Sequence, residues 1–118
     1  MKVRDIPTRA FEFGVRIINL CRYLDRTPGV SRTLSSQVLR SGTSIGANIE
    51  EGQAAQSKAD FIAKYSIALK ECRETSYRLR LLIAADVIAS RRVEPLKAEC
   101  DELAKMLARA IITARRNR

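Results

Sequence analysis

The feature that most constrains this 118-residue chain is a long stretch of helical periodicity that begins near its midpoint. Tyr65, Cys72 and Leu79 are seven residues apart, so they follow one line along an α-helix. Further apolar residues border this line: Phe61, Ile62, Ala68, Leu69, Leu82 and Ile83. So wide an apolar face favours burial, and we predict a helix over about 58–89, capped by Ser57, that forms the spine of a domain.

Three other segments carry apolar residues at helical spacing. They span about 8–26, 32–55 and 94–115. We expect Ser31 to be the N-cap residue of the second helix. Pro95 suits the first turn of the fourth helix, where its missing N–H needs no partner.

Four amphipathic helices with short connections bury their apolar faces most simply when consecutive helices reverse direction. The chain has only five Gly and three Pro, which disfavours a turn-rich β architecture. We predict an all-α fold, an antiparallel up-down four-helix bundle, in a single domain over residues 1–118.

The sequence disfavours several functional classes, because some residue types are absent and the cysteines are far apart. It has no His, the commonest general base and metal ligand, so we expect no enzyme activity, metal or cofactor. Cys21, Cys72 and Cys100 form no CxxC pair, and we expect reduced thiols in the core. No apolar stretch is long enough for a membrane span or a signal peptide, so we expect a cytoplasmic protein.

A glycine pair interrupts the second segment. Residues 41–46, SGTSIG, have low helix propensity, and propensity alone predicts a loop there. If the segment is helical, Gly42 and Gly46 are about one turn apart and allow a neighbouring backbone to approach closely. Their polar neighbours exclude a membrane dimer, which leaves packing inside the bundle or between subunits.

Asn48, Glu50 and Glu51 lie near the end of the second segment. Adjacent helical residues point about 100° apart, so Glu50 and Glu51 do not share a ligand easily. We expect Asn48 and Glu51 to make buried hydrogen bonds or ion pairs. An enzyme would instead need a pair such as Glu51 and Glu74 in a pocket with a bound metal.

The charge balance favours an anionic partner. The chain has 22 Lys and Arg against 13 Asp and Glu, a net charge of +9, and 16 of the basic residues are Arg. The planar guanidinium group of arginine matches the oxygens of a phosphate. The sequence has no aromatic-rich motif for stacking on bases. The same excess would also keep the chain soluble, and a GC-rich genome also enriches arginine. Candidate nucleic-acid-binding residues are Arg78, Arg80, Arg91, Arg92, Arg109, Arg115, Arg116 and Arg118.

Three runs of sequence form a specific pattern: QVLRSGTSIGANIEEG at 37–52, SKxDFI at 57–62 and SIALKECRET at 66–75. This pattern resembles the four-helix bundle proteins encoded in intervening sequences of bacterial 23S ribosomal RNA genes. The positions that match the family's motif are Ser44, Asn48, Glu51, Gly52 and Glu74. Gln56 departs from the basic residue often found after the Glu-Gly pair of the family.

The resemblance implies a homopentameric ring. It also implies a relation to the accessory proteins of diversity-generating retroelements, which bind a reverse transcriptase and nucleic acid. Five copies of this chain would carry about +45, a charge that attracts RNA or DNA strongly and loses affinity with salt. We therefore expect nucleic-acid binding with little sequence preference. The alternative is a protein-interaction scaffold or an accessory subunit of an enzyme such as a retroelement reverse transcriptase.

Overall fold

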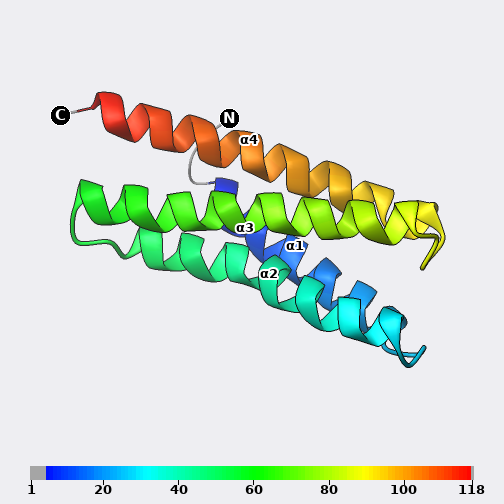
Figure 1. Ribbon diagram of the computed structural model, residues 1–118. Helices are drawn as coiled ribbons and strands as arrows, with labels where there is room; N and C mark the ends of the chain where they lie inside the picture. Colours follow the sequence, from blue (N-terminus) through cyan, green and yellow to red (C-terminus); the bar gives the residue numbers. More distant parts are fainter. Residues whose placement is uncertain (1–4, 118) are drawn as a thin grey trace.

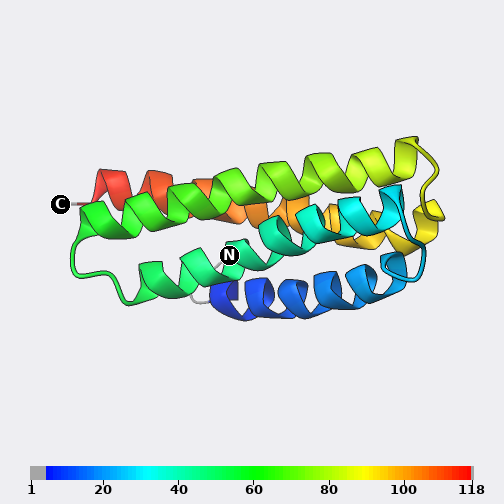
Figure 2. The same ribbon diagram turned by 60° about the horizontal axis from the view of Figure 1, so that its bottom comes forward.

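The amphipathic segments form four α-helices and one short 3₁₀ helix in a computed structural model that describes residues 5–117. The helices are α1 (Asp5–Leu24), α2 (Val30–Gln53), α3 (Lys58–Ala84) and α4 (Glu94–Arg116), and the 3₁₀ helix η1 (Ser90–Arg92) precedes α4. Consecutive helices run in opposite directions and lie side by side (Figures 1 and 2). The predicted all-α, antiparallel four-helix bundle is confirmed.

The core is centred on α3, which packs against both α2 and α4. Tyr65, Cys72 and Leu79 are completely buried, as their seven-residue spacing predicts. The α1 helix packs against α2 and, less closely, against α4, so α1 and α3 occupy diagonal corners of the bundle. The bundle is elongated, with extents of 50 × 21 × 18 Å. Within residues 5–117 no helix is long and apolar enough to span a membrane.

The turn between α1 and α2 differs from the prediction. The N-cap residue of α2 is Gly29, whose φ of 90° suits a residue without a Cβ, and not Ser31. The Ser31 hydroxyl instead donates a 2.8 Å hydrogen bond to the carbonyl of Leu24 at the end of α1. The prediction that Ser31 is the N-cap residue is therefore wrong. Ser31 lies within the first turn of α2, and its side chain links α2 to the end of α1.

The α3 helix ends earlier than predicted, at Ala84 and not near residue 89. Asp86 adopts a left-handed φ of 59°, and the amide of Val87 donates to the carbonyl of Leu82. This is the hydrogen-bond pattern of a Schellman motif, here with Asp at the position that usually holds Gly. The reversal lets Ile88 and Val93 return to the core.

The start of α3 and the start of α4 match the sequence-based expectations. The Ser57 hydroxyl accepts a 3.0 Å hydrogen bond from the amide of Asp60, which confirms it as the N-cap of α3. Pro95 lies in the first turn of α4.

Residues 41–46 are helical despite their low propensity. The hydroxyls of Ser41, Thr43 and Ser44 each donate to the carbonyl four residues earlier. A Cβ on Gly42 would lie 2.9 Å from Ile17 Cγ2, so α1 and α2 need glycine here. A Cβ on Gly46 would lie 3.6 Å from the Ala10 carbonyl oxygen, which is an ordinary contact. Close packing inside the bundle therefore requires only one glycine of the pair.

We expect Gly42→Ala to lower the free energy of unfolding by about 1–3 kcal/mol, because Ile17 is fully buried and cannot move away without strain. Gly46→Ala should be neutral or raise it by up to about 1 kcal/mol through better helix propensity. Urea unfolding followed by circular dichroism measures both changes. Equal destabilisation by the two substitutions would contradict the packing described here.

Candidate nucleic-acid interface

The structure divides the predicted nucleic-acid-binding arginines between the two ends of the bundle. Those on α3 and η1 (Arg78, Arg80, Arg91 and Arg92) lie toward the end that carries the α1–α2 turn and η1. Those on the second half of α4 (Arg109, Arg115 and Arg116) lie toward the end that carries the α2–α3 turn. Arg118 is outside the described residues. The arginines that lie within residues 5–117 therefore do not form a single surface in one chain.

The end with η1 gathers arginines from both halves of the sequence. Because the helices alternate in direction, the end of α1, the start of α2, the end of α3 and the start of α4 all meet there (Figure 1). Residues 16–32 and 78–94 together hold eight arginines and three carboxylates. We call these two segments the basic end. Four arginines of the basic end were not among the predicted nucleic-acid-binding residues: Arg16, Arg22, Arg26 and Arg32.

Most arginines of the basic end form no ion pair with the part of the chain that the structure describes. Among residues 5–117, only Arg78 of these eight has a carboxylate oxygen within 4.0 Å. Arg32 instead donates to the backbone carbonyl of Asp25. The positive charge of the basic end therefore remains available to an anionic ligand.

Tyr23 connects the two arginine groups of the basic end. The guanidinium carbon of Arg92 lies 4.0 Å from the centre of the Tyr23 ring, and that of Arg26 lies 5.1 Å from it. These are cation–π distances. The sequence does indicate the contact between Tyr23 and Arg26, because this tyrosine lies between two arginines near the end of a predicted helix. The contact between residues 23 and 92 has no such signal, because it depends on the fold.

Arg78 belongs to an internal network between α2 and α3. It lies 3.5 Å from Glu74 and donates to the carbonyl of Gln37. Arg40 of α2 also pairs with Glu74, at 3.2 Å. Below them, the hydroxyls of Thr75 and Ser41 are 2.9 Å apart in the buried interface. The structure thus gives Arg78 and the family-motif residue Glu74 roles in joining two helices.

The other family-motif residues also make contacts within the bundle. Ser44 donates to the carbonyl of Arg40, and Asn48 donates to the carbonyl of Ser44, so both bond to their own helix. Glu51 pairs with Lys64 of α3 at 3.3 Å, but it is exposed, so the expected ion pair is present and the expected burial is wrong.

Gly52 allows α2 to lie against an aromatic ring of α3. A Cβ at Gly52 would lie 2.7 Å from the ring of Tyr65, whose hydroxyl donates to Gln53 Oε1. Burial, and to a smaller extent the charge of Glu50, raise the pKa of Tyr65 to about 12. This tyrosine is therefore a neutral core residue at physiological pH.

The two carboxylates that an enzyme would need, those of Glu51 and Glu74, lie far apart. Glu51 contacts Lys64, which is ten residues before Glu74 on α3, a separation of about 15 Å along the helix. Within the described part of the chain, no group of three His, Cys, Asp or Glu residues could hold a metal ion.

The three cysteines are buried and free. Burial raises the pKa of the Cys21 thiol. A hydrogen bond with Cys100, together with burial, raises the pKa of the Cys72 thiol. Nucleophilic chemistry needs the thiolate, so Cys21 and Cys72 have the properties of core side chains.

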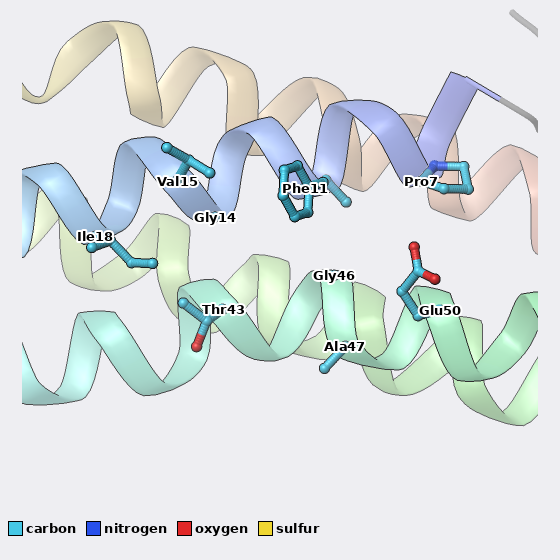
Figure 3. A pocket seen from close by; sticks show the side chains of 10 residues that line it. Pro7, Phe11, Gly14, Val15, Ile18, Thr43, Gly46, Ala47 and Glu50 are labelled. Atoms are coloured by element: carbon cyan, nitrogen blue, oxygen red, sulfur yellow. The ribbon is translucent and has the colours of Figure 1, made fainter.

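A second surface feature is an apolar groove between α1 and α2, of about 250 Å³ (Figure 3). Phe11, Val15 and Ile18 form its α1 side, and Phe11 is 70% exposed. Thr43, Gly46, Ala47 and Glu50 line the α2 side. Gly46, which packing inside the bundle does not require, is therefore part of a surface that could receive another molecule.

The comparisons with known proteins agree with the fold. The 23S rRNA-intervening sequence protein family matches residues 4–109. A solved structure from Bacteroides thetaiotaomicron, a protein of unknown function from the S23 ribosomal protein family, is 45% identical with a TM-score of 0.86. The match covers 94% of this chain and 98% of that one. None of the curated proteins compared with the chain matches it.

We expect Gly52→Ala to lower the free energy of unfolding by about 1–3 kcal/mol, because the added methyl group would overlap the Tyr65 ring. Ser44→Ala should change it by less than about 0.5 kcal/mol, since that hydroxyl bonds only to its own helix. Thermal and urea unfolding of the two variants test this difference. A destabilising Ser44→Ala with a neutral Gly52→Ala would contradict the structural interpretation of the motif.

Proposed function

The chain belongs to the 23S rRNA-intervening sequence protein family, and we propose that it is a non-enzymatic, ring-forming bundle. In this proposal the ring binds RNA or DNA with little sequence preference. The observation that carries the proposal is the basic end. Seven of its eight arginines have no carboxylate within 4.0 Å among residues 5–117, and they come from α1, the α1–α2 turn, α2, α3 and η1.

The chemistry of these side chains favours phosphate over other anions. A guanidinium group offers paired N–H donors in one plane, which match two phosphate oxygens. Arginines distributed around one end of a rod can contact several phosphates of a backbone at once. Such contacts release counterions and carry no base sequence information, so affinity depends steeply on salt and weakly on sequence.

The self-association part of the proposal rests on two exposed apolar stripes. Phe11, Val15 and Ile18 follow one side of α1, next to the apolar groove. Ile67, Tyr77 and Leu81 are exposed along α3, at the diagonal corner of the bundle. Two different surfaces on opposite sides suit head-to-tail contacts, which close into a ring when the rotation allows it. We propose five copies, in line with the family resemblance, and hence about +45 per ring.

The groove also supports the second candidate function, a scaffold that binds another protein. An apolar groove of this kind accepts an apolar helix or loop of a partner as readily as a second copy. A reverse transcriptase or another enzyme would then be the partner, and the arginines would serve its recognition.

We expect the protein to bind structured RNA and duplex DNA at about 50 mM salt, with an affinity that falls steeply as salt rises. Removing three charges at the basic end, by Arg80→Gln, Arg91→Gln and Arg92→Gln together, should lower the slope of log affinity against log salt by about 2–3 for duplex DNA. Fluorescence anisotropy over a salt series measures both quantities.

The matched control removes three charges at the other end of the bundle: Arg109→Gln, Arg115→Gln and Arg116→Gln. This variant has the same net charge and should lose less affinity and less slope. Equal losses in the two variants would overturn the basic end as the binding surface. Absence of binding by the unaltered protein near 50 mM salt would overturn nucleic-acid binding itself.

Light scattering should give about five times the 13.2 kDa protomer mass. Phe11→Glu should reduce that mass, because it places a charge on the apolar stripe of α1. Ile112→Glu is the matched control, since Ile112 is 51% exposed on α4 outside both stripes. A monomeric unaltered protein, or equal dissociation by both substitutions, would contradict the proposed interface and favour a different partner for the groove.

A further inference from the structure

A cleft of about 320 Å³ opens between α1 and the start of α4, two helices that pack less closely than the consecutive helices do. Arg16, Asn19 and Tyr23 of α1 line one side. Arg92, Pro95 and Leu96 line the other. The volume is at the lower end of the range for small-molecule sites, so the cleft can hold one small group but not a folded partner.

The cleft is cationic and has no acidic group in its lining. Arg16 and Arg92 enter it from α1 and η1, and neither has a carboxylate within 4.0 Å in the part of the chain that the structure describes. A nearby carboxylate would compete with an anionic ligand for the guanidinium N–H groups. Its absence from the lining leaves those donors free for a phosphate.

The Tyr23 ring holds one of these donors in place. Arg92 stacks on the ring, with its guanidinium carbon 4.0 Å from the ring centre. Stacking of this kind leaves the N–H groups at the edge of the guanidinium plane able to bond elsewhere. Because the ring restricts the arginine before a ligand arrives, less conformational entropy is lost on binding.

The rest of the lining suits a nucleobase better than water or a bare phosphate. Pro95, which is exposed, provides most of an apolar side, and the mostly buried Leu96 completes it. Asn19 is exposed at the cleft and offers both an amide donor and an amide acceptor. Apolar and stacking surfaces next to hydrogen-bonding groups are the means by which proteins bind unpaired bases, whose faces a duplex does not offer.

We infer that this cleft binds one unpaired nucleotide of an RNA or DNA strand. Its phosphate lies between Arg16 and Arg92, and its base lies against Pro95 and Leu96 with an edge toward Asn19. The inference rests on the proposed function and deepens it: the basic end attracts any polyphosphate, and the cleft adds a preference for single-stranded over duplex segments.

The experiment compares a fluorescent single-stranded RNA of about ten nucleotides with a duplex of equal length, by anisotropy at fixed salt. Arg16→Gln and Arg92→Gln should each weaken single-strand binding about tenfold, the effect of losing one charge-assisted hydrogen bond. Duplex binding should weaken by a smaller factor, because a duplex contacts these arginines through its phosphates alone. Tyr23→Leu keeps the net charge and should also reduce single-strand affinity, because Arg92 loses its stacking partner.

Arg22→Gln is the matched control, because Arg22 is exposed at the same end but does not line the cleft. It should affect single strands and duplexes equally. If Arg16→Gln and Arg92→Gln reduce single-strand binding no more than Arg22→Gln does, the cleft inference fails while the proposed function stands. Circular dichroism verifies that each variant is folded.

A second arm uses adenosine monophosphate, with nuclear magnetic resonance of the Asn19 side-chain amide and the Tyr23 ring as the readout. Shifts at these groups that Arg92→Gln abolishes support the cleft. If the protein binds neither RNA nor DNA but shows those shifts, the proposed function fails and the ligand is a free nucleotide instead of a strand. If the protein binds no RNA or DNA and adenosine monophosphate causes no shifts, both the proposed function and the cleft inference are overturned.

Discussion

The alternating direction of the four helices is the constraint on which the candidate interface depends. Burial of one wide apolar face on α3, centred on Tyr65, Cys72 and Leu79, requires helices on both sides of it. Short connections then force each neighbour to reverse. The end of α1 therefore lies beside η1, and arginines separated by about sixty residues of sequence share one end of the bundle. The basic end is a consequence of core packing combined with where the arginines fall along the chain.

The amino-acid sequence predicts the helices well because periodicity reports which face is buried. It predicts the end of α3 poorly, because the reversal uses Asp86 in a left-handed conformation where Gly would have been a clear signal. It also misplaces the cap of α2, because Ser31 has the residue type of an N-cap while Gly29 has the required backbone. Both errors arise where backbone conformation and tertiary contacts override residue preference.

The candidate site was predicted only in part, for a different reason. The arginines predicted from the sequence all lie after residue 77, whereas the bundle brings together charges from both halves of the chain. Arg16, Arg22, Arg26 and Arg32 were therefore not predicted, and Arg109 was predicted together with residues that lie near the opposite end. The Arg92–Tyr23 contact depends on how closely α1 approaches η1, which periodicity does not specify.

The most direct test of the central claim is ultraviolet crosslinking of the bound protein to RNA, followed by mapping of the crosslinked peptides. The account predicts crosslinks within residues 16–32 and 78–97, which contain the basic end and the lining of the cleft beside it. Crosslinks concentrated in the second half of α4, or in the apolar groove between α1 and α2, would contradict it.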